Sequence, residues 1–205
     1  AAIEAAAAGK WGLGTNENDG DPLQRGFDHF TGYYCQRHAH NHYPSFLFKD
    51  GSKVPQPGNT DGDTGETWSQ DVFERQALDW LDANKDKPLF LFLPVIVPHV
   101  ALQAPEEAIK QYVGKFDDPA YPGNKGYRKH PHPRAAYAAM ITRMDKHIGR
   151  VMDLVKRLGL DEAAAKLLGG QSAKNDMLAE RERPSAPQPR APKAGNPWFR
   201  QGRRG

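Results

Sequence analysis

The spacing of apolar residues along the chain predicts two long helices. In segment 71–84 the apolar side chains fall on one stripe at helical spacing: Phe73, Ala77, Trp80 and Leu81. Thr67 or Ser69 can supply the N-cap of this helix. In segment 134–158 the apolar positions repeat at three- and four-residue steps: Tyr137, Met140, Ile141, Met144, Ile148, Val151, Met152, Val155 and Leu158. Gly159 follows at a place where glycine commonly ends a helix.

A continuous apolar run at 89–97 predicts a strand between these helices that is covered on both faces. The run contains Pro94 and is far shorter than the roughly 20 residues of a membrane-spanning helix. A shorter helix is expected at 106–113, directly behind Pro105. Because a helix followed by a doubly buried strand is typical of layered α/β folds, we predict an α/β fold with a mainly parallel sheet.

Residues 163–205 lack this periodicity, and their composition differs from that of the preceding chain. Ala, Gly, Pro and Arg dominate the segment, and its few apolar residues are scattered. Such a segment cannot bury enough apolar surface to offset the entropy that it would lose on ordering. We therefore expect residues 1–162 to form the folded part and residues 163–205 to be a disordered basic tail.

The charge of the chain is concentrated in the same tail. The formal net charge is +3, and residues 161–205 carry nine basic and five acidic side chains, so the remainder is close to neutral. This balance gives no argument for nucleic acid as a partner, although the tail could engage a polyanion. The single cysteine, Cys35, excludes a disulfide framework and a cysteine-based zinc site. Residues 1–8 do not have the basic start of a signal peptide.

Three alternating histidines, His38, His40 and His42, form a candidate site. On a strand, all three would project from one face. Imidazole is a good ligand for zinc, copper and iron, but no cysteine or carboxylate lies nearby in the sequence to complete a ligand set. The alternative is a polar pocket wall or loop. We assign the three histidines to substrate binding and predict no metal ligands.

The acidic segment 59–65, Asn-Thr-Asp-Gly-Asp-Thr-Gly, looks like the start of a calcium-binding EF-hand loop. That loop requires glycine at its sixth position and glutamate at its twelfth, where this chain has Thr64 and Gln70. We interpret the segment as an Asp-rich turn.

Two further residues, His99 and Lys10, are candidates for chemistry. His99 stands just past the carboxyl end of the predicted buried strand, where ligand sites of α/β sheets lie. A histidine there can bind an anion or transfer a proton. Lys10 lies in a glycine-flanked segment, where an ammonium group could pair with an oxyanion.

Four short motifs follow one another along the chain, and their order is more specific than any one of them alone. They are Gly-Lys-Trp-Gly-Leu-Gly at 9–14, Gly-Phe-Asp-His-Phe-x-Gly at 26–32, Pro-His-Val-Ala-Leu-Gln-Ala-Pro at 98–105 and Tyr-Ala-Ala-Met-Ile-x-x-Met-Asp-x-x-Ile-Gly-Arg at 137–150. Together they resemble motifs of the sulfatase family, and of arylsulfatases in particular. The resemblance covers residues 9–162 and implies an alkaline-phosphatase-like α/β core.

The resemblance also implies a mechanism. In such sulfatases a cysteine is converted to formylglycine, whose hydrate attacks the sulfur of a sulfate ester, and a calcium ion polarises the sulfate oxygens. By this resemblance Lys10 contacts the nucleophile and the sulfate, and His99 binds the sulfate and assists the leaving oxygen. The implied partner is a sulfate ester, either a small molecule or a sulfated carbohydrate, and the implied location is periplasmic or secreted.

The chain departs from the family pattern at several positions. Gly12 stands where many members have a histidine, a group that His38, His40 or His42 could replace. Cys35 lacks the context of the family nucleophile, which precedes the lysine motif, and we interpret it as a small packing residue. The aspartate pair and the Ser-Asp-Asn-Gly stretch that hold calcium in the family are not recognisable.

We therefore interpret the chain as an internal piece of a sulfatase catalytic domain, incomplete at both ends and inactive by itself. Two alternatives remain open. One is a non-catalytic protein that binds a polyanion or a sulfated glycan, with the basic tail contributing. The other is a metal-dependent phosphatase of the same superfamily, against which the Gly-Lys-Trp motif argues only through the resemblance.

Overall fold

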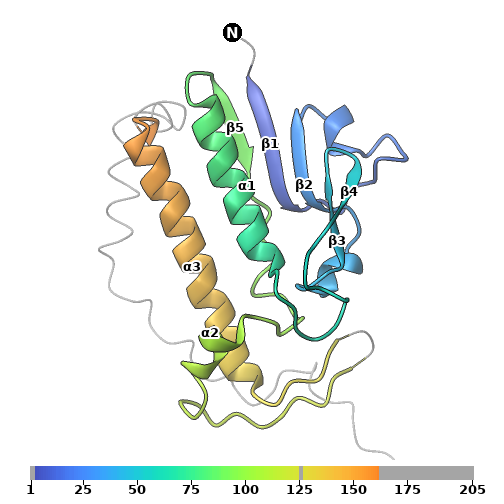
Figure 1. Cartoon of the computed structure of the whole chain (residues 1–205), viewed down its shortest axis with the longest axis vertical. Coiled ribbons are helices and arrows are strands. Elements are labelled where there is room, and N and C mark those ends of the chain that lie inside the picture. Colours follow the sequence, from blue (N-terminus) through green and yellow to red (C-terminus); the bar gives the residue numbers. More distant parts are fainter. Residues whose placement is uncertain (1–2, 125–126, 162–205) are drawn as a thin grey trace, which may run out of the picture. The chain divides into compact units, whose positions relative to one another are not determined.

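The computed structural model describes residues 3–124 and 127–161, which form a five-stranded sheet with helices packed against it (Figure 1). The strands are β1 (Glu4–Lys10), β2 (His29–Tyr33), β3 (Phe46–Lys49), β4 (Ser52–Pro55) and β5 (Leu89–Phe92). The α-helices are α1 (Ser69–Asn84), α2 (Glu106–Lys110) and α3 (Pro133–Arg157), and two short 3₁₀ helices are η1 (Pro22–Gln24) and η2 (His38–His40). The predicted disordered tail, 163–205, lies outside the described residues.

The sheet is mixed, with strand order β4-β3-β2-β1-β5. The strand β1 runs parallel to both β2 and β5, whereas β3 is antiparallel to β2 and to β4. The carboxyl ends of β5, β1 and β2 therefore meet at one edge of the sheet (Figure 1). This edge carries the loops in which most candidate residues lie, as α/β folds generally place their ligand sites.

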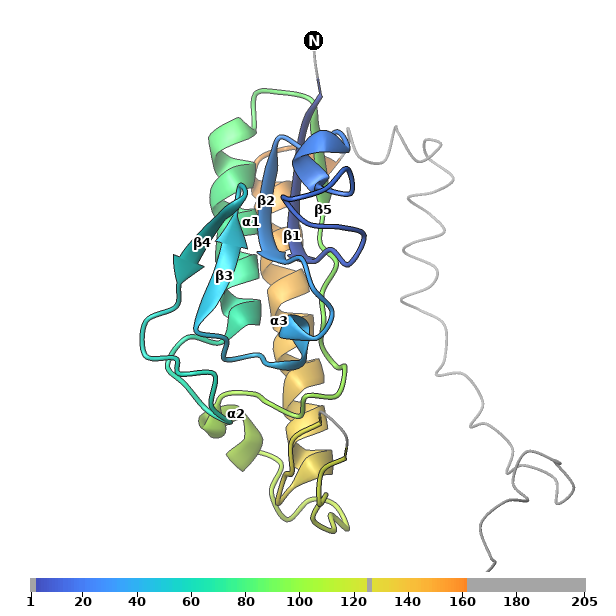
Figure 2. The ribbon, with the colours of Figure 1, turned by 90° about the vertical axis from the view of Figure 1, so that its right-hand side faces the viewer.

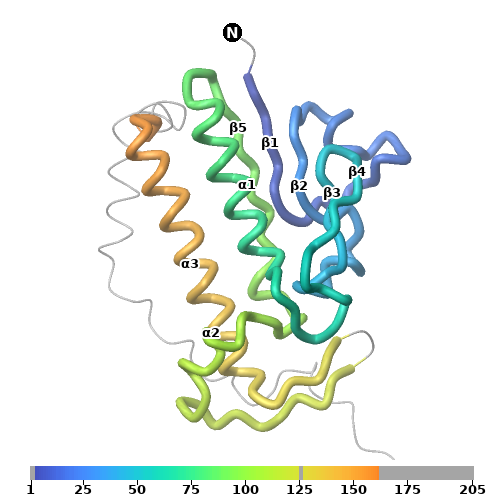
Figure 3. The backbone as a smooth tube through the Cα atoms, viewed as in Figure 1, coloured from blue at the N-terminus to red at the C-terminus, as the bar shows by residue number. Residues whose placement is uncertain are grey.

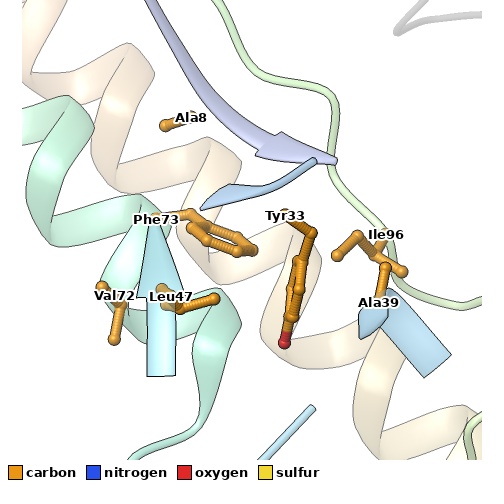
Figure 4. Packing of buried hydrophobic residues seen from close by; sticks show 7 residues of the cluster. All are labelled: Ala8, Tyr33, Ala39, Leu47, Val72, Phe73 and Ile96. Carbon is orange, nitrogen blue, oxygen red and sulfur yellow. The ribbon is translucent and has the colours of Figure 1, made fainter. Parts of the chain in front are cut away.

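The strand β1, which lies between β2 and β5, consists mainly of alanines, and the hydrophobic pattern did not predict it. All five of its central residues are buried. Ala8 packs with Tyr33 and Phe73 on one side of the sheet (Figure 4), whereas Ala7 packs with Phe30 on the other. Alanine has a low intrinsic preference for strands, but its small side chain allows layers on both faces to approach the sheet closely.

The long helices α1 and α3 lie side by side on the same face of the sheet (Figures 1 and 2). The helix α1 contacts β1, β2 and β5, and α3 packs against α1 and α2. Figure 3 follows the chain from the end of β5, past α2, to the start of α3. None of the described helices has the length and apolar character needed to cross a membrane.

The predicted helices form, but their boundaries differ from those expected. The helix α1 begins at Ser69, its N-cap is Trp68, and no side chain caps it, so the predicted Thr67 or Ser69 cap is wrong. The predicted helix 106–113 is shorter, because α2 ends at Lys110.

The C-terminal end of α3 confirms the prediction for Gly159. The amides of Gly159 and Leu160 donate to the carbonyl oxygens of Lys156 (3.0 Å) and Val155 (3.0 Å). These two hydrogen bonds satisfy carbonyl groups that a helix end leaves free.

The predicted strand 89–97 is also shorter than expected, because β5 ends at Phe92. It is not covered on both faces as predicted, since Phe90 and Phe92 on one face are exposed. Pro94 has no amide proton to contribute to a ladder, and its carbonyl oxygen instead accepts a hydrogen bond from the Lys10 amide (3.0 Å). The segment beyond β5 thus leaves the strand direction and crosses the end of β1. This crossing brings the segment that carries His99 towards Lys10.

Candidate active site

Lys10 is the last residue of β1, at the carboxyl edge of the parallel strands. The preceding residue, Gly9, has φ +143°, and a Cβ atom there would lie 2.3 Å from the carbonyl oxygen of Pro94. Only glycine fits such a close backbone approach. The glycine in the Gly-Lys-Trp motif therefore lets the segment after β5 pass directly over the end of β1.

His99 lies in that segment and meets His40, which comes from η2. Their Nε2 atoms are 3.3 Å apart, and their ring centroids are 5.2 Å apart. The ring of Tyr127 packs against both, with centroids 5.1 Å from His40 and 6.2 Å from His99. Three segments far apart in the sequence therefore place aromatic side chains around one point.

The electrostatic surroundings of His99 connect this pair with Lys10. Partial burial lowers the pKa of His99 below its usual value, and the positive charges of His40 and Lys10 lower it further. Both groups disfavour a charged His99, as like charges do at short range. Lys10, His40 and His99 therefore form one electrostatic unit at the sheet edge, which we call the basic edge site.

His40 is held in place by the residues around it. Ala39 is fully buried, and its amide donates to the Cys35 carbonyl oxygen (3.2 Å). The hydroxyl of Tyr33 donates to the Asn41 carbonyl oxygen (2.6 Å), which anchors the residue after His40 to the end of β2. The η2 turn is thus fastened on both sides of His40.

His38 and His42 do not join the basic edge site. Residues 38–40 form a 3₁₀ helix, so the alternation that a strand would produce does not arise. The His38 ring packs between Tyr33 (4.8 Å) and Phe46 (4.6 Å), and burial lowers its pKa. These contacts place the half-buried His38 against aromatic rings of β2 and β3.

His42 is fully buried, and burial lowers its pKa to about 4. Its Nδ1 lies 3.3 Å from the Gln103 carbonyl oxygen, which fixes the proton on Nδ1. Its Nε2 is buried without a hydrogen-bond partner among the described residues. His42 is therefore neutral at physiological pH.

Gln103 is a positioning residue that the sequence analysis did not identify. Its side-chain Oε1 accepts from the His42 amide (2.8 Å), and its Nε2 donates to the Asp63 carbonyl oxygen (2.8 Å). Its own carbonyl oxygen accepts from the Trp68 indole (3.0 Å). A glutamine in a loop carries no sequence signal for such a role, because the three partners come from distant segments.

The acidic segment 59–65 is a structured turn. The Asp61 carboxylate accepts from the amide (2.6 Å) and the hydroxyl (2.6 Å) of Ser45, and Asp63 pairs with Arg128. These interactions occupy the carboxylates with internal partners, in agreement with an Asp-rich turn.

Cys35 is exposed, so our interpretation of it as a packing residue is wrong. It lies two residues beyond β2, where the chain turns towards η2.

A second cluster of charged side chains joins α1 to α3. Because it contains two carboxylates and a histidine, we asked whether it could hold the calcium ion that the family resemblance implies. Among the described residues, one group of side chains could offer ligand atoms to a metal ion: Asp71, Glu74 and His147. Their ligand atoms lie within 4.8 Å of one another. Arg143 Nη2 donates to both oxygens of Asp71 (2.8 and 2.7 Å), and Arg150 pairs with Glu74. Because two guanidinium groups already balance two carboxylates, and calcium prefers six to eight oxygen ligands, this cluster does not fit calcium.

Comparison with known proteins gives the family. The sulfatase family model matches residues 1–165. An arylsulfatase of Klebsiella aerogenes is 25% identical over 206 aligned positions, which cover 76% of this chain and 41% of that protein. The uncharacterized sulfatase YdeN of Escherichia coli K12 is 26% identical over 140 positions, which cover 67% of this chain and 21% of YdeN.

The fold agrees with this result. The crystal structure of the protein Ps i-CgsB superposes with a TM-score of 0.58 at 22% identity, covering 78% of this chain and 35% of that one. A second crystal structure of Ps i-CgsB, in complex with k-i-k-neocarrahexaose, gives a TM-score of 0.57. The chain thus spans less than half the length of these relatives, with the α/β architecture of a partial sulfatase core. The match of the family model over most of the chain shows that it belongs to the sulfatase family.

Proposed function

We propose that the chain carries the sulfate-binding part of a sulfuric ester hydrolase site, with Lys10 and His99 as the groups that act on the sulfate. The observation that carries this proposal is that the segment after β5 crosses the end of β1: the Lys10 amide donates to the Pro94 carbonyl oxygen, and the charge of Lys10 lowers the pKa of His99. Family membership supplies the reaction class, and the basic edge site supplies positive charge where an anion would bind.

The chemistry of the two groups suits a sulfate ester. The Lys10 ammonium is a fixed positive charge, and such preorganised charge stabilises an anion without rearrangement at the moment of reaction. His99 has a lowered pKa and is therefore neutral in the free protein near pH 7. An anion beside it favours the protonated form, so we expect sulfate binding to raise the pKa of His99 and prepare it to donate a proton to the leaving oxygen.

Sulfated carbohydrate is the substrate class that we favour. Ps i-CgsB, which shares the fold, has been crystallised with k-i-k-neocarrahexaose. The family resemblance also admits aryl sulfates, which provide convenient probes.

Binding of inorganic sulfate tests the proposal directly. We expect sulfate to shift the NMR resonances of the His99 ring, and Lys10→Ala to weaken binding about tenfold, as expected for the loss of one charge-assisted hydrogen bond. Lys49→Ala is the matched control, because Lys49 is an exposed lysine on β3 that contacts Gln76. Equal weakening by both substitutions would show that sulfate responds only to net charge, and the proposal would be wrong.

We further propose that the isolated chain does not hydrolyse sulfate esters, since the described residues do not provide a fitting calcium site. An aryl sulfate assay with calcium should show no turnover. Turnover that Lys10→Ala abolishes would overturn this proposal. Steep salt dependence of glycan binding, lost on deletion of 163–205, would instead favour a polyanion-binding protein.

A further inference from the structure

The basic edge site contains a second imidazole, His40, to which the proposed function assigns no role. Its Nε2 faces the Nε2 of His99 at 3.3 Å, within the range of a single shared N–H···N hydrogen bond. In this arrangement the protonated Nε2 of one ring donates the hydrogen bond, and the unprotonated Nε2 of the other ring accepts it. A second Nε2 proton on the pair would break this bond, because both nitrogens would then be donors and one ring would carry a positive charge.

The charged group that acts on the pair, Lys10, is positive. The groups that face it are Lys10, at the end of β1, the buried neutral His42 and the phenol ring of Tyr127. No carboxylate of residues 3–124 or 127–161 lies within 4.0 Å of a His40 or His99 nitrogen. A cluster of two imidazoles and an ammonium group without a counter-charge is suited to an anion, which would relieve the repulsion between them.

The loop after β1 offers no side chain at the position two residues beyond Lys10. Gly12, two residues beyond Lys10, has φ +78°, and the nearest atom to a Cβ there would be the Gln36 side chain at 3.5 Å. The loop after β1 therefore contributes no imidazole. The second imidazole of the basic edge site comes from η2 instead.

His40 is also held in position before any ligand binds. The anchors on Ala39 and Asn41 hold the backbone, and Tyr127 packs on the ring at an interplanar angle of 32°. A group that is fixed in this way loses little entropy when an anion arrives.

We propose that His40 and His99 act as a two-imidazole clamp that binds one tetrahedral oxyanion together with Lys10 and takes up a proton as it does so. The proposal rests on the proposed function and deepens it, because it names His40 as a further substrate-binding residue. Each ring then donates an Nε2–H to a sulfate oxygen, and the anion takes the place of the shared hydrogen bond. The added proton comes from solvent and leaves with the anion.

Calorimetric titration with inorganic sulfate tests the clamp. Sulfate affinity should rise from about pH 8 to about pH 6, where imidazoles gain protons, and titration in buffers of different ionisation enthalpy should show proton uptake. The variant His40→Gln should bind sulfate about tenfold more weakly at the lower pH and show a flatter pH dependence. Lys10→Ala should weaken binding at both pH values, because it removes a positively charged group that would contact the anion. His29→Gln is the matched control, since His29 lies at the other end of β2 beside Asp50.

The outcomes separate the two proposals. If wild-type protein binds sulfate through Lys10 and His99 but His40→Gln binds with unchanged affinity and proton uptake, the clamp is wrong and the proposed function stands. If wild-type protein does not bind sulfate, both are wrong. Should His40→Gln fail to fold, NMR of the wild-type rings decides: sulfate must shift His40 and His99 together and leave His29 unmoved, and a shift of His99 alone contradicts the clamp.

Discussion

Two neighbouring histidines, His40 and His42, show how the environment of a single residue decides its chemistry. His40 is half-buried at the sheet edge, whereas His42 is fully enclosed and has a pKa lowered to about 4. An unfolded histidine has a pKa of about 6.5. The unfolded chain therefore binds a proton at this position more readily than the folded protein does.

We predict that His42 stabilises the folded protein above about pH 6.5 and that this contribution is lost as the pH falls towards 4. A pKa difference of about 2.5 units corresponds to a loss of about 3 kcal/mol in the free energy of unfolding. An NMR titration should show the His42 ring neutral at about pH 5.5. Protonation of the His42 ring at or above about pH 6.5, the value of an unfolded histidine, would contradict its burial.

The candidate residues could be predicted from the sequence only in part. The position of His99 beyond an apolar run and of Lys10 between glycines indicated the carboxyl edge of the sheet, where the structure has Lys10 and the segment that carries His99. The sequence could not distinguish His40 from its neighbours, because that depends on a 3₁₀ turn and on its anchors to β2. Gln103 was missed for the same reason, since its partners are distant in sequence.

At the level of elements, β1 was missed because its alanines do not produce a strand pattern, although the strand is buried inside the sheet between β2 and β5. The helices were predicted better, since helix amphipathicity repeats over many residues and the end of α3 carries a local glycine signal. Helix ends such as that of α1 depend on tertiary contacts, and there the sequence prediction was wrong.

Two glycines in different elements should respond oppositely to alanine. Gly9→Ala places a Cβ atom 2.3 Å from the Pro94 carbonyl oxygen at φ +143°, and we expect it to destabilise the protein by at least about 2 kcal/mol. Gly149→Ala lies within α3 with no atom near the new Cβ, and should stabilise the protein by about 0.5–1 kcal/mol. Urea unfolding of both variants measures these changes. A stabilising Gly9→Ala would contradict the close approach over β1.

The α1–α3 charge cluster should be a structural ion-pair network. Burial raises the pKa of Asp71, but hydrogen bonds from His147 and Arg143 more than offset this effect and leave it below its usual value. Its stabilising effect is therefore present above the unfolded pKa of about 3.9 and lost as the pH falls through the lower folded pKa.

Removing the arginine of this network should reveal its contribution. We expect Arg143→Leu to lower the free energy of unfolding by about 1–3 kcal/mol at neutral pH, because it removes the guanidinium group whose Nη2 contacts both oxygens of the partly buried Asp71 carboxylate. Asp82→Asn, which breaks the exposed pair with Lys85, should change it by less than about 0.5 kcal/mol. If added calcium stabilised wild-type protein and Asp71→Asn abolished that effect, the cluster would be a metal site and our interpretation would be wrong.

At the scale of the whole molecule, the described part of the chain exposes an apolar surface on the sheet. Phe90 and Phe92 of β5 are 53% and 41% exposed, and the Phe27 ring lies 6.0 Å and 6.3 Å from theirs. Among the described residues β5 pairs only with β1, so its other edge presents free backbone groups. Exposed apolar edge strands are sites of association between chains.

We therefore expect the isolated chain to self-associate through β5 in a concentration-dependent manner, and Phe92→Lys to reduce this association. The lysine places a charge on an exposed position of the edge strand without removing a core residue, and charged side chains on edge strands oppose pairing. Val113→Lys is a control matched for charge and exposure, because Val113 is 42% exposed and lies beyond α2, away from the sheet. Sedimentation velocity over a range of concentrations compares the two variants with wild-type protein. If Val113→Lys alone abolished association, the contact would lie near α2, and the edge of β5 would not be the interacting surface.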